Sequence, residues 1–306
     1  YLEIAISYFE RNLHGEAKII FNNLLSSHPL GLAWSAFIDN NIERIKTIDA
    51  LSIDFVHPFR RESIDILNWV NNNYSSWKWK YLLSLNLWAK NREQEALELL
   101  KSSKNEPNNA AFYASRAYLK NKLKKVSAEK DIQLSLEYAK NSSIYVNAIQ
   151  FLQQKNDWAE ALEISQKALR LFPNNFNIQL LKTKSLLYLN ELDNAIEILS
   201  QTNVLPSEVG KESHDIYVSL HLAKALRYLK ERNLQMASSY IDKSKKWPKN
   251  LGIGKPYEPD YSIQKVMMKI LDGKYISNDI KAELKRLSRN YKGYKNYLLV
   301  ELISLI

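Results

Sequence analysis

Apolar residues recur at helical spacing along most of the chain, and two segments show the pattern most clearly. Residues 156–164 read NDWAEALEI, so a polar turn leads into a helix with a small residue, Ala161, near its start. Residues 190–199 (NELDNAIEIL) repeat this arrangement around Ala195, which lies 34 positions after Ala161. The same turn followed by an alanine returns at residues 12–17, at residues 91–97 and, more weakly, at residues 232–237.

A spacing of 34 residues is the period of tetratricopeptide repeats, each of which is a pair of antiparallel helices. The alanine is expected where the two helices touch, because a larger side chain would hold them apart. Pro29, Pro173 and Pro248 follow three of these units and end the second helix of each. The pattern predicts an all-α fold, namely a tetratricopeptide-like α-α superhelix (solenoid) of about five to seven helix pairs.

We expect residues 1–306 to form a single helical-repeat solenoid. Its expected parts are degenerate repeats (1–140), clearer repeats (141–248) with an insertion (201–215), an ordered loop (247–260) and C-terminal helices (261–306). The chain begins with Tyr1 and not with methionine. It is therefore expected to be a fragment or a processed portion of a longer protein.

Composition supports the helical interpretation and removes several function classes. Only 7 of 306 residues are glycine, about 2% against a usual 7%. That scarcity disfavours most all-β folds and the glycine-rich loops of nucleotide-binding α/β folds. The absence of cysteine excludes disulfides, thiolate zinc sites and cysteine nucleophiles. No apolar run is long enough to span a membrane, so we expect a soluble protein, cytoplasmic or periplasmic in a bacterium.

Candidate catalytic chemistry is sparse. The five histidines form no HExxH pattern and no cluster with metal-ligand spacing, so we expect no catalytic residue, no metal and no cofactor. His214 and His221 are seven residues apart and could share a helical face, either as a metal or acid–base pair or as packed histidines beside Tyr217. Residues 252–255 (GIGK) lack the remaining elements of a phosphate-binding loop. The chain is therefore predicted not to be an enzyme.

Several segments, taken together, resemble a specific bacterial family. They are His57 to Glu62, Trp77 to Leu100, Glu106 to Ala117, Val204 to Tyr217 and Trp247 to Asp260. In this order and spacing they resemble the C-terminal tetratricopeptide-type region of a family catalogued only as a domain of unknown function. The N-terminal part of that family resembles galactose-mutarotase-like sugar-binding β-domains. The resemblance implies that any carbohydrate chemistry of the family lies outside this chain.

The two irregular segments of this resemblance supply candidate binding residues. Glu208 and His214 lie in the first segment, and Lys255 and Tyr257 lie in the second. The glycines of the second segment are expected to let an ordered loop fold back over the helices, with Trp247 and Tyr257 packed beneath it. Lys255 would then face a partner, because ordered loops on rigid scaffolds often carry binding residues.

The concave groove of a tetratricopeptide array is lined by the first helix of each repeat. By register with Ala161 and Ala195, the expected groove positions are Ser143, Val146, Gln150, Asn177, Leu180, Lys184 and Tyr188. Asn177 and Lys184 are similar to residues that hold peptide carboxylates in chaperone-binding members of the superfamily. The remainder of that carboxylate clamp is not matched, so no C-terminal peptide ligand is predicted. Gln150, Asn177, Lys184 and Tyr188 are retained as candidate binding residues.

Aromatic and basic residues offer alternative surfaces. Trp77, Trp88 and Tyr81 share a helical face and are predicted to be core, whereas Trp79 falls on another face and is a candidate for exposure. The basic run at residues 281–295 (KAELKRLSRNYKGYK) contributes to the excess of 43 Lys and Arg over 33 Asp and Glu. It fits either a solvated amphipathic helix or a surface for nucleic acid or anionic lipid. The apolar last ten residues, YLLVELISLI, must be buried, either as a final helix or against another domain.

These features lead to one preferred function and two alternatives. The chain is predicted to be a non-catalytic helical-repeat scaffold for protein–protein or interdomain contacts within a larger bacterial protein. The first alternative is an accessory region that completes the ligand site of a carbohydrate-active, mutarotase-like domain absent from this chain. The second is polyanion binding through the basic runs. A protein or a neighbouring domain is the expected partner, a carbohydrate would bind through the missing domain, and nucleic acid is the least favoured.

Overall fold

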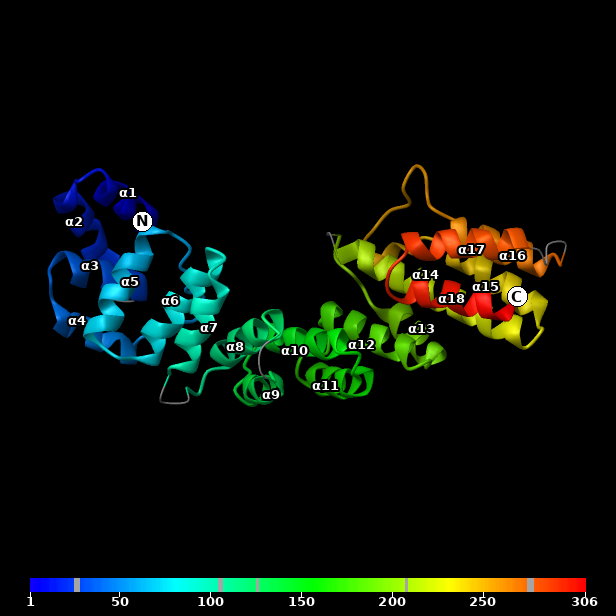
Figure 1. Cartoon of the computed structure of the whole chain (residues 1–306), viewed down its shortest axis with the longest axis horizontal. Helices are drawn as coiled ribbons and strands as arrows, with labels where there is room; N and C mark the ends of the chain where they lie inside the picture. Colours follow the sequence, from blue (N-terminus) through cyan, green and yellow to red (C-terminus); the bar gives the residue numbers. More distant parts are fainter. Residues whose placement is uncertain (25–27, 104–106, 125–126, 207–208, 274–277) are drawn as a thin grey trace. The chain divides into compact units, whose positions relative to one another are not determined.

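The computed structural model describes residues 1–24, 28–103, 107–124, 127–206, 209–273 and 278–306. Over these residues the fold contains 18 α-helices, two short 3-10 helices and no strand (Figure 1). Helices that are adjacent in the sequence pack against each other in pairs. The prediction of an all-α, tetratricopeptide-like fold built from helix pairs is thereby confirmed.

The chain divides into two compact units, and the first spans Tyr1–Lys140. Its elements are α1 (Leu2–Glu10), α2 (His14–Leu24), α3 (Pro29–Ile38), α4 (Ile42–Lys46), η1 (Thr47–Ala50), α5 (Glu62–Asn73), α6 (Trp77–Ala89), α7 (Glu93–Lys101), α8 (Ala110–Lys122) and α9 (Glu129–Glu137). The side chains of Trp34, Trp79 and Tyr113 are its largest fully buried ones. They form one continuous hydrophobic core within this unit.

The second unit spans Asn141–Ile306 and begins where the sequence changes from degenerate to clearer repeats. Its elements are α10 (Ser142–Gln154), α11 (Trp158–Leu171), α12 (Phe176–Tyr188), α13 (Leu192–Gln201), α14 (Val209–Lys230), α15 (Leu234–Ser244), η2 (Lys249–Leu251), α16 (Ser262–Leu271), α17 (Asn278–Asn290) and α18 (Tyr294–Leu305). The long helix α14 packs against α12, α13, α15 and α18 and so forms the centre of this unit. The expectation of one solenoid over residues 1–306 stays a prediction.

The turn-then-alanine pattern has a direct structural basis. The asparagines at positions 12, 91, 156 and 190 adopt left-handed backbone conformations with φ between 59° and 62°, which asparagine tolerates better than most residues. Asp157 N and Glu191 N then each donate to a carbonyl five residues earlier at 2.9 Å, which closes the preceding helix. The alanines that follow, Ala161 and Ala195 among them, are fully buried between helices.

Trp79 corrects one expectation from the sequence. Its side chain is 0% exposed, and its indole Nε1 donates to the carbonyl oxygen of Ile45 at 3.1 Å. Trp77 and Trp88, expected in the core, are only partly buried. The reason is that α6 contacts α5, α7 and η1 and is therefore enclosed on several sides. A prediction that assigns only one buried face to such a helix underestimates how many of its side chains are buried.

The connection between α13 and α14 is shorter than the predicted insertion at 201–215, because α14 already begins at Val209. Residues of η2 and its flanks pack on this connection: Val204 N donates to Asn250 O at 2.8 Å, and Asn250 Nδ2 donates to Thr202 O at 2.8 Å. Gly252 follows with φ +71°, and a Cβ atom there would lie 2.8 Å from the carbonyl oxygens of Val204 and Leu205. The close approach and the left-handed backbone both require glycine at this position.

The apolar chain end folds into the second unit as its last helix. Leu298, Leu299 and Leu302 of α18 are buried, and α18 packs against α14 and α17. The opposite side of the helix keeps Tyr297 and Val300 about half exposed. α18 is thus anchored on one face and presents aromatic and aliphatic groups on another.

Candidate functional site

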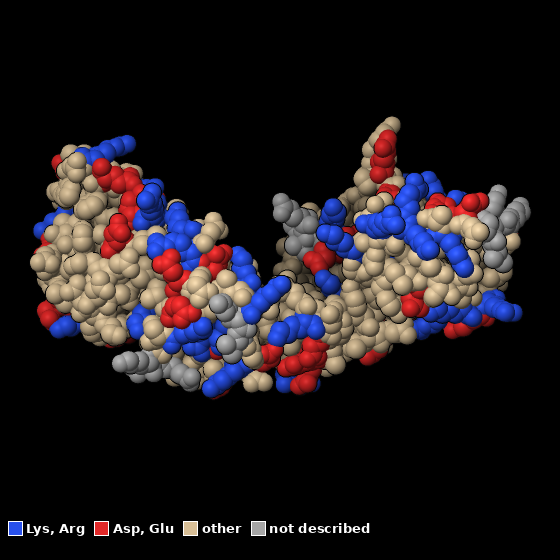
Figure 2. Space-filling view, in the orientation of Figure 1, with Lys and Arg blue, Asp and Glu red and all other residues tan. Residues whose placement is uncertain are grey.

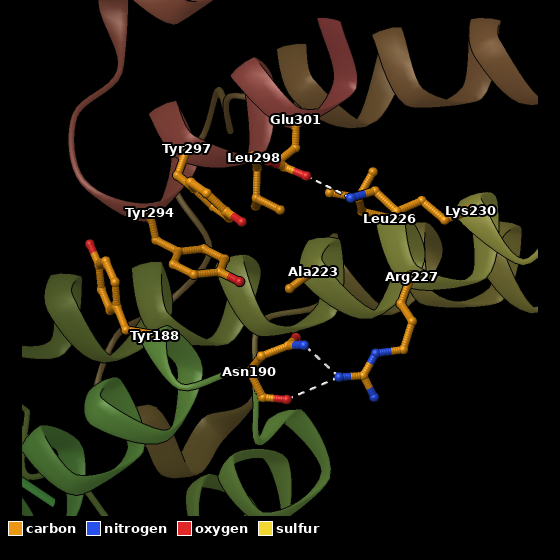
Figure 3. A pocket seen from close by; sticks show the side chains of 10 residues that line it. All are labelled: Tyr188, Asn190, Ala223, Leu226, Arg227, Lys230, Tyr294, Tyr297, Leu298 and Glu301. Carbon is orange, nitrogen blue, oxygen red and sulfur yellow. Dashed lines mark hydrogen bonds and ion pairs between the residues drawn. The ribbon is translucent and has the colours of Figure 1, made fainter. Parts of the chain in front are cut away.

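A cavity of about 380 Å³ lies within the second unit, between the end of α12, the second half of α14 and residues 294–301 of α18 (Figure 3). A cavity of this size falls in the range of ligand pockets. Its lining residues are Tyr188, Asn190, Ala223, Leu226, Arg227, Lys230, Tyr294, Tyr297, Leu298 and Glu301. Since all of them belong to residues 141–306, the cavity is complete within one compact unit.

Two helices each present one face to this cavity. The lining positions on each helix follow the i, i+3, i+4, i+7 spacing of a single helical face. The face of α14 consists of Ala223, Leu226, Arg227 and Lys230, and that of α18 consists of Tyr294, Tyr297, Leu298 and Glu301. The packing of α18 on α14 brings the two faces together, so the cavity depends on the register between these helices.

Asn190 positions the guanidinium of Arg227. Asn190 is the left-handed turn residue between α12 and α13, with φ 62°. Arg227 Nη2 donates to its main-chain oxygen and to its side-chain Oδ1, both at 3.0 Å. Both acceptors are neutral, so they orient the guanidinium without neutralising its charge. The remaining N–H groups of the guanidinium are available to other acceptors.

Three tyrosines form the aromatic wall of the cavity. The ring of Tyr188 is stacked on Trp158 at 3.7 Å between centroids, and the ring of Tyr294 meets Tyr188 edge-on at 5.1 Å. Tyr297 lies beside Tyr294, with centroids 5.4 Å apart. Burial raises the pKa of Tyr188 and, more strongly, that of Tyr294 above the usual phenol value. Both hydroxyls therefore stay protonated and can donate hydrogen bonds.

The charges around the cavity do not cancel. Lys230 Nζ lies 2.6 Å from Glu301 Oε2, which forms an ion pair across the two helical faces. Arg227 makes no ion pair with any residue that the structure describes, and its guanidinium donates to the two oxygens of Asn190. The lining therefore carries one cation that no carboxylate balances. An arrangement of this kind favours an anionic group in a partially apolar setting.

Two other cavities offer less to a ligand. One of about 510 Å³ in the first unit contains Asp49 and Lys78. There Asp49 accepts hydrogen bonds from Tyr74 and Ser76, and Lys78 Nζ donates to three main-chain oxygens, so all three N–H groups of this ammonium are already used within the fold. The other, of about 200 Å³, lies beside Tyr217 and His221 and is mostly apolar. Of these three cavities of described residues, the α12–α14–α18 cavity is the strongest candidate site.

Of the predicted groove residues, only Tyr188 lines this cavity. Lys184 Nζ lies 3.2 Å from Glu212 Oε1, so Lys184 already forms an intramolecular ion pair. Gln150 and Ser143 are exposed on α10, Val146 and Asn177 are partly buried, and Leu180 is buried in the core. Leu180 is thus not a groove residue, because α12 is covered on more than one side by α11, α13 and α14.

The candidates from the two irregular segments lie apart from the cavity lining. His214 is buried, its ring stacks on Trp247 at 3.5 Å, and its Nε2 lies 3.2 Å from Lys246 O. Lys255 is exposed, and Tyr257 is 98% exposed, which corrects the expectation that Tyr257 packs beneath the loop. Figure 1 shows why: the orange segment before α16 runs clear of the helices of its unit. Glu208 lies outside the described residues.

His214 and His221 are packing residues of α14, and no group of three or more metal-ligating side chains occurs in the described parts of the chain. Burial lowers the pKa of both imidazoles below the ordinary 6.5. At a pH between the pKa values of the folded and unfolded states, the unfolded chain binds more protons than the folded chain. The contribution of these two histidines to the free energy of unfolding is therefore complete above pH 6.5. It is lost as the pH falls through 6.5 toward the pKa values of the folded state.

We expect the free energy of unfolding of the chain to decrease between about pH 7.5 and pH 5, with a slope that depends on these two histidines. Urea unfolding across this range checks it. The double substitution His214→Gln and His221→Gln is expected to flatten the slope, whatever it does to stability at a single pH. His57→Gln, at an exposed position of the first unit, is the matched control. An unchanged slope in the double variant would contradict the expectation.

Sequence reasoning missed most of the cavity. Arg227, Lys230, Tyr294, Tyr297 and Glu301 were not selected, because they come from two helices whose mutual register no local pattern reveals. The sequence did contain one indication of the cavity residues. Asn190 belongs to the turn of a clear repeat, and Tyr294 and Tyr297 stand at helical spacing within a run of tyrosines and cations.

No curated protein matches the chain. A crystal structure of the C-terminal part of a TPR repeat-containing protein from Cytophaga hutchinsonii is similar, with 14% identity, a TM-score of 0.46, and coverage of 80% of this chain and 94% of that chain. No described helix is both long and apolar enough to cross a bilayer.

The family model that matches is that of the ChAPs, described as Chs5p-Arf1p-binding proteins, and it covers residues 68–226. This is more than half of the chain. The matched range includes the α12 end of the cavity, with Tyr188 and Asn190, and most of α14. On this match, the chain belongs to the ChAPs family.

Proposed function

We propose that this chain is a non-catalytic helical scaffold that binds a protein partner, and that the α12–α14–α18 cavity receives a segment of that partner. The single observation that carries the proposal is the cavity itself, which combines three tyrosines with an unbalanced arginine. Tyrosine and arginine are the residues most enriched at the energetic centres of protein interfaces. The family name supports the same reading, since it describes its members as binding two other proteins.

The rim of the cavity suits a protein segment. Tyr297 is 51% exposed, and Val300, one turn further along α18, is also about half exposed. A partner that entered the cavity would cover both side chains and remove apolar surface from water. The scaffold would contribute a preformed site, because the lining residues are held by helix packing and by the bonds from Asn190.

Selection from a phage-displayed library of random peptides tests this function, with the purified chain as bait. The selected peptides are expected to lose at least about fivefold in affinity on Tyr297→Ala, since truncating an interface tyrosine typically costs about 1 kcal/mol or more. Tyr118→Ala is the matched control, because Tyr118 is 50% exposed on α8 of the first unit. Peptides that bind equally to both variants, or a selection that returns none, would overturn the proposal.

The two alternative functions, and the bacterial, mutarotase-linked origin, remain hypotheses. Lys285, Arg286 and Arg289 of α17 are exposed. Figure 2 shows Lys and Arg side chains gathered on the visible face of the second unit. Polyanion binding through them would weaken steeply with added salt. The accessory role beside a mutarotase-like domain would require that domain to contact residues such as His214 or Lys255. Among the described residues, the cavity gives protein binding the most specific support.

A further inference from the structure

The chemistry of the α12–α14–α18 cavity specifies the segment that it would accept. We propose that this cavity binds an acidic side chain, Asp or Glu, that stands next to a bulky apolar or aromatic side chain in the partner segment. The inference rests on the proposed function and adds a sequence preference to it. It is carried by the charge balance, the donors and the apolar surface of the lining.

The charge balance favours one carboxylate. Glu301 already neutralises Lys230 at 2.6 Å, which leaves the guanidinium of Arg227 as the cation without a carboxylate partner among the described residues. A single positive charge matches the single negative charge of an ionised Asp or Glu. A phosphate group carries up to two negative charges, of which this lining would balance one, so it is the poorer match.

Arg227 is prepared for this contact. Its Nη2 is occupied by the two oxygens of Asn190, so the side chain is already oriented before a ligand arrives. A guanidinium has five N–H donors in a planar fork, and those left free can bind both oxygens of a carboxylate. Because the guanidinium is fixed in advance, little side-chain entropy is lost on binding.

The rest of the lining selects the neighbouring side chain. Ala223 and Leu226 of α14 and Leu298 of α18 provide aliphatic surface beside the rings of Tyr294 and Tyr297 (Figure 3). A bulky apolar or aromatic residue would fill this space and contact the tyrosine rings. The protonated hydroxyl of Tyr294 adds a donor near the acidic group. An acidic residue flanked by small residues would leave the apolar part of the cavity empty.

The site is matched to an internal side chain in preference to a chain-terminal carboxylate. A terminal carboxylate is usually held by several cations and amides, whereas this lining offers one unbalanced cation. Lys184, which is similar to a carboxylate-holding residue of chaperone-binding tetratricopeptide proteins, is not in the lining and pairs with Glu212. The partner is therefore a protein segment that passes through the cavity with its acidic residue pointing at Arg227.

The test uses the display-selected peptides, labelled for fluorescence anisotropy, and compares each with a version whose acidic residue is changed to the amide. On the unmodified chain, the amide version is expected to bind at least about tenfold more weakly, because hydrogen bonds to charged groups are worth about 1.5–3 kcal/mol. On Arg227→Gln, the acid and amide versions should bind alike. Arg286→Gln removes the same charge from the exposed side of α17 and should preserve the preference.

Each outcome has a defined meaning. Selected peptides that depend on Tyr297 but bind equally as acid and amide would overturn this inference and leave the proposed function standing. A phosphoserine version that binds more tightly than the acidic one would overturn the carboxylate assignment. Arg227→Lys, which keeps the charge, should retain part of the preference and guards against misfolding of Arg227→Gln. Peptides that are insensitive to Tyr297→Ala would overturn the proposed function itself.

Discussion

Replacing Trp79 by alanine is expected to lower the free energy of unfolding of the first unit by about 4 kcal/mol. The indole is completely buried, and its Nε1 donates to Ile45 O at 3.1 Å. The substitution would remove this large buried surface, open a cavity between α6, α5 and η1, and leave the Ile45 carbonyl oxygen without its donor. Urea unfolding monitored by circular dichroism measures the change.

Trp77→Ala provides the comparison within the same helix. Trp77 is only partly buried and contacts Phe112 edge-on at 5.9 Å between centroids. Its truncation is expected to cost clearly less than that of Trp79. The opposite order would match the expectation from helical spacing alone, in which Trp77 faces the core and Trp79 faces solvent, and would contradict the packing described above.

Removal of the Asp131 carboxylate should be the second most damaging change, at about 3 kcal/mol in the first unit. Asp131 is 1% exposed and lies between two cations, with Arg116 Nη2 at 2.7 Å and Lys120 Nζ at 2.8 Å. Asp131→Ala would leave these two largely buried cations facing each other without a counter-charge. The pair Arg92–Glu95 is exposed, so Glu95→Ala is the matched control.

The same unfolding experiment distinguishes this ion cluster from a surface one. We expect Glu95→Ala to change stability by less than about 0.5 kcal/mol, as for most exposed ion pairs. Asp131→Asn, which keeps the shape and some hydrogen bonds, should fall between the two. If Asp131→Ala lowered the free energy of unfolding no more than Glu95→Ala does, the two cations would have become solvated without a large loss of stability. The cluster would then not hold α8 to α9.

Local sequence predicted the helix pairs well because their chemistry is local. A left-handed asparagine and a buried alanine a few residues later are both encoded within a single turn, as at Asn156 and Ala161. Trp79 was misjudged because its burial depends on η1 and α5, which the spacing within α6 does not report. Tyr257 was misjudged because composition does not reveal whether an irregular loop folds back or extends.

The candidate site was largely beyond local prediction for a related reason. Tyr188 is the one predicted groove residue that lines the cavity, because repeat register places it on the first helix of a pair. Arg227 and Tyr297 were missed because the cavity exists only once α18 packs on α14, and these helices are separated in sequence by α15, α16 and α17. The bonds from Arg227 to Asn190 likewise join residues 37 positions apart.

Hydrogen exchange measured by mass spectrometry, with and without a display-selected peptide, tests most directly whether the α12–α14–α18 cavity is the binding site. We predict slower exchange on peptide binding in the first half of α18 and in the turn that contains Asn190. The effect should disappear in Tyr297→Ala and persist in Tyr118→Ala. Protection confined to the first unit, or to the loop that carries Tyr257, would contradict the assignment of this cavity as the binding site.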